Sequence, residues 1–263
     1  MVRIETQPKD SLPLPDYFEA RGMLSDHEWT QAYISLVLQW PKTCKIPSRE
    51  RHLVGLAKAL AFAWEPGILN HTDLALKMGY TPEQIAEVMK AVSVTLGLAR
   101  LAAVSDSMGE SRRLDPGTVR ALSGVKSYFG VVPSLFKQRL VTEDRSWLDD
   151  LLVVTRPAWE SGPGALDPKL RALACLAASA CAGWKEGTKL YSQAAKRFGA
   201  TEKDTADVIR SVFKTTVSNS MAAGFRTPCH IPSLERYQTI LSAYVSKGAL
   251  TNKRTDPLLR PRR

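Results

Sequence analysis

The chain has 263 residues, with 36 lysines and arginines against 26 aspartates and glutamates, so its formal net charge is +10. Its 44% apolar and 24% charged residues are typical of a soluble globular protein and exclude a disordered chain, a collagen and a disulfide-rich scaffold. Such a charge suits nucleic acid, an anionic membrane surface or an acidic small molecule, so the position of the charge must decide between these partners.

The sequence also indicates where the protein resides. The first twenty residues are acidic on balance and contain no apolar run, so we expect neither a signal peptide nor a transit peptide. The longest uncharged apolar stretch, 172–184, is shorter than the roughly 20 residues that span a bilayer. The four cysteines show no CxxC spacing, which favours reduced thiols. We therefore expect no membrane span, and a location in the cytoplasm or another reducing compartment.

Helix signals follow one another along the chain. Ser25 and Glu28 form a capping box, and apolar residues then recur at helical spacing. Further starts are marked by N-cap residues and by prolines in the first turn, and Gly79 is a suitable C-cap. No stretch alternates with period two, so the expected fold class is all-α. The expected helices are 25–40, one that follows Pro47-Ser48, 66–78, 81–98, and one that begins at Asp115-Pro116.

Internal repetition is the strongest organisational signal. The six tryptophans form two triplets of nearly equal spacing, at 29, 40 and 64 and at 147, 159 and 184. A shift of 120 residues places Trp64 on Trp184, Gly79 on Gly199 and Thr81 on Thr201. Repeats of this kind should be sought before any motif is interpreted. We therefore predict two tandem helical domains, 1–112 with an N-terminal extension 1–24, and 113–250, followed by a basic tail 251–263.

The tail accounts for much of the unusual charge. Residues 251–263 carry four of the ten net positive charges, so the rest of the chain is only mildly basic. The sequence contains no basic helix with interleaved aromatic residues, so we expect no specific nucleic-acid binding. We expect the tail to dock on an acidic protein surface instead.

Several segments resemble one known superfamily. They are YFGVVPSLF (128–136), DPKLRALACLAAS (167–179) and FGAT (198–201) in the second half, and NHTDLALKMGYTPEQIAEVM (70–89) in the first. Together they are similar to the carboxymuconolactone decarboxylase and alkylhydroperoxidase D-like superfamily, whose all-helical unit carries a His-x3-Ala-x3-Gly-x-Thr-x-Glu segment. The resemblance implies two tandem units of this fold, and it leaves the reaction open because a fold does not fix the chemistry.

The peroxidase branch of that superfamily depends on a Glu-x11-Cys-x2-Cys-x3-His motif, in which the two thiols carry the redox chemistry. At the corresponding positions the first half has His52, Trp64, Gly67 and His71, and the second half has Ala172, Trp184, Gly187 and Tyr191. Neither half has the dithiol. A thiol peroxidase mechanism is therefore excluded, and Cys175 and Cys181, which lie on different faces of one helix, do not replace the missing pair.

The decarboxylase branch lacks these cysteines and works by proton transfer with a helix-borne histidine. The resemblance implies His71 as general acid-base, because histidine titrates near neutral pH. His52 would approach His71 if the family packing holds and would act as a second proton carrier. Glu65 would orient the imidazole if the chain breaks at Pro66. Trp64, Gly67, Trp184 and Tyr191 would line the former redox pocket, and the second half would be catalytically silent.

Plainer interpretations of the same residues remain open. His71 and His52 can be merely packed or solvated histidines, and the tryptophans can simply fill the volume left by the redox site. A two-histidine metal site would need Glu65 or Glu50 as a further ligand. We expect no cofactor and no metal.

Two classes of function follow. The first is a cofactor-free lyase or isomerase acting on a small anionic carbonyl or lactone acid, with its site in the first half only. The alternative is a catalytically degenerate scaffold, a subunit of a larger assembly. The resemblance also implies an oligomer of tandem units.

Overall fold

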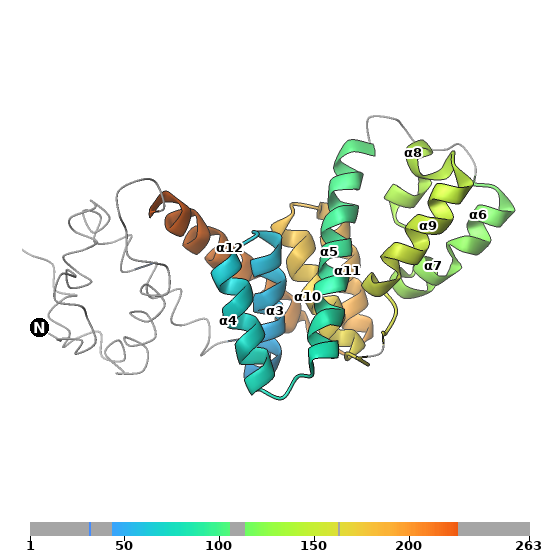
Figure 1. The fold of residues 1–263 in the computed structure, drawn as a ribbon. Helices are drawn as coiled ribbons and strands as arrows, with labels where there is room; N and C mark the ends of the chain where they lie inside the picture. The colour runs from blue at the N-terminus through green and yellow to red at the C-terminus, as the bar shows by residue number, and fades with distance from the viewer. Residues whose placement is uncertain (1–31, 33–43, 106–113, 163, 226–263) are drawn as a thin grey trace, which may run out of the picture. The chain divides into compact units, whose positions relative to one another are not determined.

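The computed structural model describes residue 32, residues 44–105, 114–162 and 164–225, with side chains up to residue 217 except that of Pro66. Within these ranges Cys44–Ser220 form one compact unit built from helices (Figure 1). No extended strand occurs in the described ranges, and the predicted all-α class is confirmed. The expected helix 25–40 and the basic tail 251–263 lie outside the described residues.

Three helices of the first half match the predicted ones closely: α3 (Ser48–Ala61), α4 (Glu65–Lys77) and α5 (Pro82–Ser105). The break before α4 falls at Trp64, after Ala63 with its left-handed φ of 49°. Thr81 and Gln84 then exchange hydrogen bonds as a capping box at the start of α5. That helix extends seven residues past the expected end at residue 98, because its apolar pattern continues through Ala99 to Leu101.

A group of short helices follows and lies together at one end of the unit (Figure 1). The first begins at Pro116 as predicted, because the Asp115 side chain accepts a hydrogen bond from the Thr118 backbone N–H at 3.0 Å. This group consists of α6 (Pro116–Ala121), α7 (Ser123–Phe129), η2 (Ser134–Lys137), α8 (Arg139–Thr142), α9 (Arg145–Thr155) and η3 (Arg156–Ala158).

A second three-helix set completes the unit: α10 (Pro168–Cys181), α11 (Lys185–Arg197) and α12 (Glu202–Phe225). Each of these helices has the same length as α3, α4 and α5 respectively and starts 120 residues later. The cap geometry repeats too, since Gly79 and Gly199 both have positive φ, of 83° and 91°. The two sets are thus structurally equivalent, while their origin by duplication stays a prediction.

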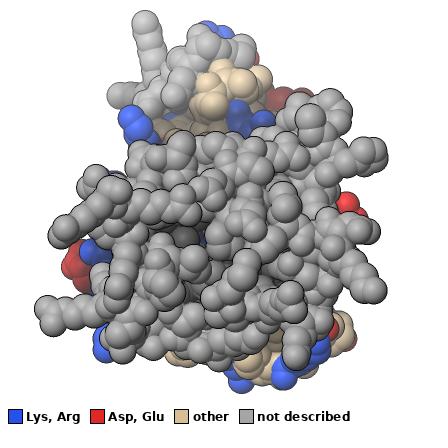
Figure 2. Space-filling model, turned by 90° about the vertical axis from the view of Figure 1, so that its left-hand side faces the viewer, with Lys and Arg blue, Asp and Glu red and all other residues tan. Residues whose placement is uncertain are grey.

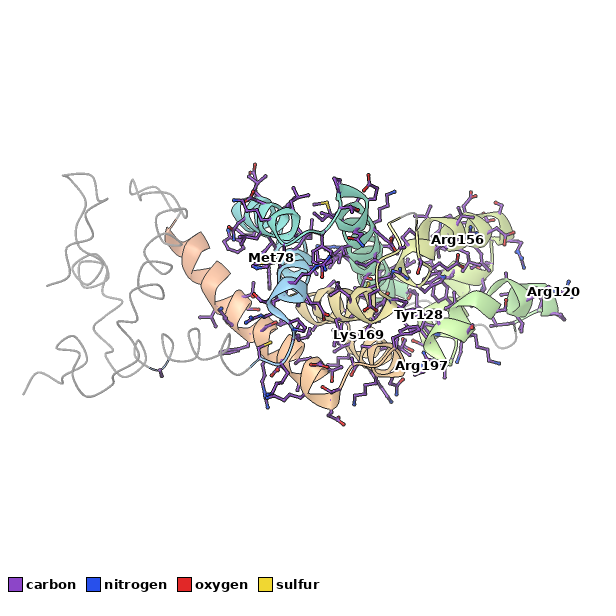
Figure 3. The ribbon with its side chains drawn as sticks, turned by 90° about the horizontal axis from the view of Figure 1, so that it is seen from below. Met78, Arg120, Tyr128, Arg156, Lys169 and Arg197 are labelled. Carbon is purple, nitrogen blue, oxygen red and sulfur yellow. The ribbon has the colours of Figure 1, made fainter. Side chains whose placement is uncertain are left out.

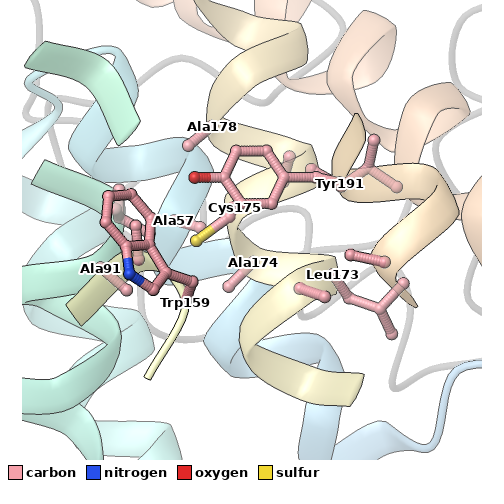
Figure 4. Packing of buried hydrophobic residues seen from close by; sticks show 14 of the residues in the cluster. Ala57, Ala91, Trp159, Leu173, Ala174, Cys175, Ala178 and Tyr191 are labelled. Atoms are coloured by element: carbon pink, nitrogen blue, oxygen red, sulfur yellow. The ribbon is translucent and has the colours of Figure 1, made fainter. Parts of the chain in front are cut away.

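One hydrophobic core runs through both halves. Helix α10 packs against α3 and α5 as well as against its own neighbour α11. Figure 4 shows the consequence, since Ala57 and Ala91 of the first set surround the same space as Cys175 and Tyr191 of the second. Neither half would bury its apolar face alone in this arrangement. The boundary predicted at 112/113 stays a prediction for the evolutionary unit, but the physical core spans it.

A buried ion pair crosses between the halves. Arg171 on α10 donates to Glu87 on α5, and the two side chains are only 1% and 5% exposed. Glu87 also accepts from the backbone N–H groups of Gly162 (2.9 Å) and Leu166 (3.3 Å). These bonds satisfy a carboxylate that would be costly to bury alone. The pair therefore fixes α10 and the loop before it against α5.

The predominantly apolar helix α5 passes a length and composition test for a membrane span. In the structure it contacts α3, α10 and η3, and its buried residues belong to the core. Core helices of globular proteins commonly meet the same test. Figure 3 shows how the second set is joined to the short helices, where Arg197 of α11 donates to the backbone carbonyl of Tyr128 on α7.

Candidate functional site

The predicted histidines come together on α3 and α4. The ring centroids of His52 and His71 are 5.9 Å apart, with a tilt of 46° between the ring planes. The two helices are antiparallel neighbours because the break at Trp64 reverses the chain between them. His52 therefore approaches His71 as the family packing implied, and the imidazoles are close enough to act on one small molecule.

His71 lies against the backbone of α3 at Gly55. A Cβ atom at this glycine would stand 2.4 Å from Cε1 of the imidazole, so no larger residue fits while the ring keeps its place. Gly55 is itself in a helix, where glycine is less favourable than alanine. The close approach of the His71 ring explains a residue that helix propensity disfavours.

Burial and positive neighbours keep both imidazoles neutral. Desolvation, together with the charges of Lys58, His52 and Lys214, lowers the pKa of His71 to about 3. Desolvation and Arg51 also lower the pKa of His52. The expectation that His71 titrates near neutral pH is therefore not met. In the resting protein it is a neutral ring that can donate one hydrogen bond and accept another.

Two lysines that the sequence analysis did not select lie close to the histidines. Lys58 on α3 is 6% exposed, and its Nζ donates to the carbonyl of Ser211 on α12 at 3.5 Å. Lys214 follows on α12, and its charge acts on both Lys58 and His71. Desolvation and Lys214 lower the pKa of Lys58 to about 7. The group of the site that titrates near neutral pH is thus a lysine.

A signal for Lys58 was present in the sequence. It interrupts the apolar run from Leu53 to Trp64, and the residue 120 positions later is Ala178, fully buried in α10. A charge where both the helix face and the repeat call for a small apolar residue indicates a special role.

The third predicted catalytic residue lies apart from the pair. Glu65 is exposed in the first turn of α4, six positions before His71, and therefore on another face of the helix. The groups whose charges act on the His71 imidazole are Lys58, His52 and Lys214. The role of Glu65 as orienting carboxylate stays a prediction.

A metal ion finds few ligands near the histidines. Glu50, the other carboxylate considered as a ligand, lies 3.5 Å from the Nζ of Lys169. Among the described residues no group of three His, Cys, Asp or Glu side chains comes together as a metal site would require. The two imidazoles therefore lack a third ligand of this kind within that part of the chain.

The two predicted pocket tryptophans pack in the same way. Each precedes its helix as the N-cap residue and covers a glycine three positions later, Trp64 over Gly67 and Trp184 over Gly187. In both cases a Cβ on the glycine would stand 2.1 Å from the indole ring. This contact explains the repeated Trp-x2-Gly spacing as a packing motif.

In the second half, the position equivalent to His71 is occupied by Tyr191, which is hydrogen-bonded within the core. Tyr191 is fully buried, and its hydroxyl lies 3.0 Å from Thr95 Oγ1 of α5. The Cys175 thiol, which stands where the first half has Gly55, hydrogen-bonds with Tyr191 and Thr95. Figure 4 shows Cys175 beside the Tyr191 ring. Burial raises the pKa of this thiol to about 11, so it is protonated and unreactive. Tyr191 is thus part of a satisfied core network.

The first half leaves several buried polar atoms without hydrogen-bond partners. Such atoms are rare in folded proteins, and each calls for an explanation such as a ligand or a catalytic role. They are Glu50 Oε2, His52 Nδ1, Trp64 Nε1, His71 Nδ1 and Thr72 Oγ1. Three of these five atoms belong to residues predicted for the site.

Comparisons with known proteins support the fold and the family resemblance. Residues 154–225 match the model of the carboxymuconolactone decarboxylase family. The chain is also similar to the crystal structure of a protein assigned as a gamma-carboxymuconolactone decarboxylase subunit from Burkholderia xenovorans LB400, with 20% sequence identity and a TM-score of 0.58. That similarity covers 88% of this chain and 91% of the other, and it shows the fold. A comparison with curated protein sequences finds no match. The resemblance inferred from the sequence is confirmed.

Proposed function

Because the chain is carboxymuconolactone decarboxylase-like in its fold and in the sequence of its second half, we propose that it is a cofactor-free lyase or isomerase. Its substrate would be a small anionic carbonyl or lactone acid. The site lies in the first half, at His71 and His52, although the family model matches residues of the second half. The observation that carries the proposal is the pair of adjacent imidazoles, 5.9 Å apart, with unpartnered buried Nδ1 atoms.

These imidazoles suit proton transfer at carbon. When a carbonyl acid loses carbon dioxide, an electron pair moves toward the carbonyl and a proton must then reach the carbon atom. His71, held neutral by burial, accepts or relays a proton, and His52 serves as second proton carrier. An isomerase would use the same two groups to remove a proton at one carbon and return it at another. The dithiol of the peroxidase branch is absent from both halves.

The test measures turnover of γ-carboxymuconolactone and a panel of small keto acids by the full chain. Carbon dioxide release and proton NMR detect the products. We expect His71→Ala to lower kcat/KM by at least a hundredfold, because acid-base groups contribute about 10²–10⁴-fold. Tyr191→Phe, the change at the equivalent position of the second half, should leave turnover within a factor of three. Equal turnover by wild type and His71→Ala would overturn the proposal.

A scaffold function is the second candidate, and one observation favours it. The pKa of His71 is far below neutral, which makes a weak base, and the second half has replaced the site with a satisfied core network. A degenerate subunit of a larger assembly would show no turnover on any member of the panel and would copurify with a stable partner. A free homo-oligomer without such a partner would contradict it.

Assembly and location complete the proposal. We expect an oligomer of tandem units, and a basic tail that docks on an acidic protein surface. Cys44, Cys175 and Cys181 are free thiols in the structure, which supports a reducing compartment. Figure 2 shows described lysine and arginine side chains at separate places around the margin of one face, with acidic side chains among them.

A further inference from the structure

The imidazole of His71 fills the space of a side chain that α3 does not have. A Cβ atom at Gly55 would stand 2.4 Å from Cε1, 2.6 Å from Nε2 and 2.7 Å from Nδ1 of that ring. Carbon atoms in ordinary contact are about 3.5–4.0 Å apart. A methyl group at Gly55 would therefore displace the ring from α3 by about 1 Å.

The same glycine lies beside the second imidazole. Gly55 follows His52 by three positions on α3, so the two residues are on the same face of the helix. The His71 ring packs on Gly55, and its centroid is 5.9 Å from that of the His52 ring. The missing Cβ at Gly55 thus allows the two imidazoles to come this close.

The second half shows that a pair of such helices packs without a glycine at this position. Helices α10 and α11 have the lengths of α3 and α4, and the residues equivalent to His52, Gly55 and His71 are Ala172, Cys175 and Tyr191. There the thiol of Cys175 hydrogen-bonds with Tyr191. The glycine therefore accompanies the two histidines and is not a requirement of the helix pair itself.

No hydrogen bond at Nδ1 orients the His71 ring. Within the described residues this atom is buried and has no hydrogen-bond partner. Acid-base histidines are commonly oriented by the hydrogen bond that their second nitrogen makes. Glu65, which was expected to supply such a bond, is exposed in the first turn of α4. The contact with the α3 backbone at Gly55 is the feature that holds the ring in place.

We propose that Gly55 is a positioning residue, which holds the imidazole of His71 beside that of His52 for proton transfer to and from one substrate. This inference rests on the proposed function, because these two imidazoles are the groups that would move the proton. It adds a residue that occupies none of the motif positions of the family. A displacement of about 1 Å at a reacting group can cost about a hundredfold in rate.

The experiment compares the full chain with Gly55→Ala, which adds one methyl group. Gly97→Ala is the matched control, since nothing lies within 4 Å of a Cβ at that position of α5. Steady-state kinetics give kcat and KM for each acid of the panel that the wild type converts. Independently of turnover, NMR of protein labelled at histidine measures the nuclear Overhauser effect between the ring protons of His52 and His71.

We expect Gly55→Ala to lower kcat by about a hundredfold and to change KM less than threefold, because the substrate still binds while the proton-transfer group is displaced. The Overhauser effect between the rings should weaken at least twofold, since it falls steeply with distance. Gly97→Ala should leave both readouts unchanged. A Gly55→Ala variant that loses stability but keeps the wild-type kcat and the wild-type ring contact would overturn the inference.

A double variant covers the case in which Gly55→Ala does not fold. In a His71→Ala background the added methyl group meets no ring. There Gly55→Ala should fold and keep or raise the urea midpoint, because alanine is preferred to glycine in a helix. If Gly55→Ala lowers the midpoint equally with and without the imidazole, the glycine serves helix packing alone and the inference falls.

The outcome is separable from that of the proposed function. Turnover that depends on His71 but not on Gly55 would leave the lyase proposal standing and remove this one. A ring contact that Gly55→Ala breaks, in a chain that converts no tested acid, would support positioning by Gly55 and remove the lyase proposal.

Discussion

The two three-helix sets have the same helix lengths and order, but they differ in the polar side chains packed between the helices. In the second set the hydroxyl of Tyr191 hydrogen-bonds with Thr95 of α5, and the Thr95 hydroxyl also donates to the carbonyl of Ala91. In the first set His71 takes the place of Tyr191, and Gly55 and Lys58 stand where the second set has a cysteine and an alanine. The interior around Tyr191 is thus hydrogen-bonded, whereas the interior around His71 holds buried nitrogen atoms without hydrogen-bond partners.

This difference suggests that two equivalent three-helix sets can serve different ends, one for stability and the other for function. Unsatisfied buried polar groups and a buried ammonium group lower stability, so they persist only where another gain offsets them. The second set contributes the hydrogen-bonded core around Tyr191, and the buried ion pair between Arg171 and Glu87 ties α10 to α5. Three changes test this division, and the largest effect is expected at the ion pair.

Arg171→Ala should lower the free energy of unfolding by about 3–5 kcal/mol, because it leaves the Glu87 carboxylate buried without its cation. Urea denaturation measures the loss. Lys169→Ala on the same helix removes a partly exposed pair with Glu50 and should cost at most about 1 kcal/mol. Asp207→Ala removes the buried acid at the position equivalent to Glu87. Asp207 accepts a hydrogen bond from the Lys45 backbone N–H at 2.9 Å, so this variant measures what the equivalent acid of α12 contributes. A loss below about 1 kcal/mol in Arg171→Ala would contradict this role.

Gly55→Cys should destabilise the protein by about 1–3 kcal/mol, because its Cβ would overlap the His71 ring. The double variant Gly55→Cys with His71→Tyr recreates the pair found in the second set and should recover part of the loss in a double-mutant cycle. Gly97→Ala is the matched glycine control, since nothing lies within 4 Å of its Cβ position in α5. That control should be neutral or stabilising by up to about 1 kcal/mol. Additive effects in the cycle would show that the two positions do not interact.

Tyr191→Phe should give the smallest loss, about 0.5–1.5 kcal/mol, because it removes the buried hydroxyl that hydrogen-bonds with Thr95 and the weakly bonding Cys175 thiol. Tyr128→Phe is the contrasting control, since the Tyr128 hydroxyl is buried without a hydrogen-bond partner. Removing that hydroxyl should be neutral or stabilising. The comparison fails if thermal or urea unfolding shows the two phenylalanine variants to be equally destabilised.

Much of the frame could be predicted from local signals. Pro47-Ser48, Pro66 and Thr81-Pro82 each mark a helix start that the structure reproduces within about one residue, because caps and prolines act on their own turn. The end of α5 was missed, since no glycine or proline follows residue 98 to stop an apolar helix. The internal repeat in the sequence predicted the second set, whose helices begin 120 residues after those of the first.

The candidate site could be predicted only in part. His52 and His71 were found because they occupy motif positions, and their proximity followed from the family packing. Glu65 was expected to orient His71 only if the chain broke at Pro66. The break falls earlier, at Trp64, so Glu65 and His71 both belong to α4 and lie on different faces of it. Lys214 lies 143 residues from His71, and no spacing rule connects them.

The sequence by itself determined the helices, their repeat, the missing dithiol and the histidine pair, because these depend on local residue identity and periodicity. Only the tertiary structure decided how the halves share one core, that α12 of the second half carries Lys214 to the site of the first, and which groups there titrate near neutral pH. Burial and charge depend on neighbours distant in the chain, and a pKa is set by those neighbours.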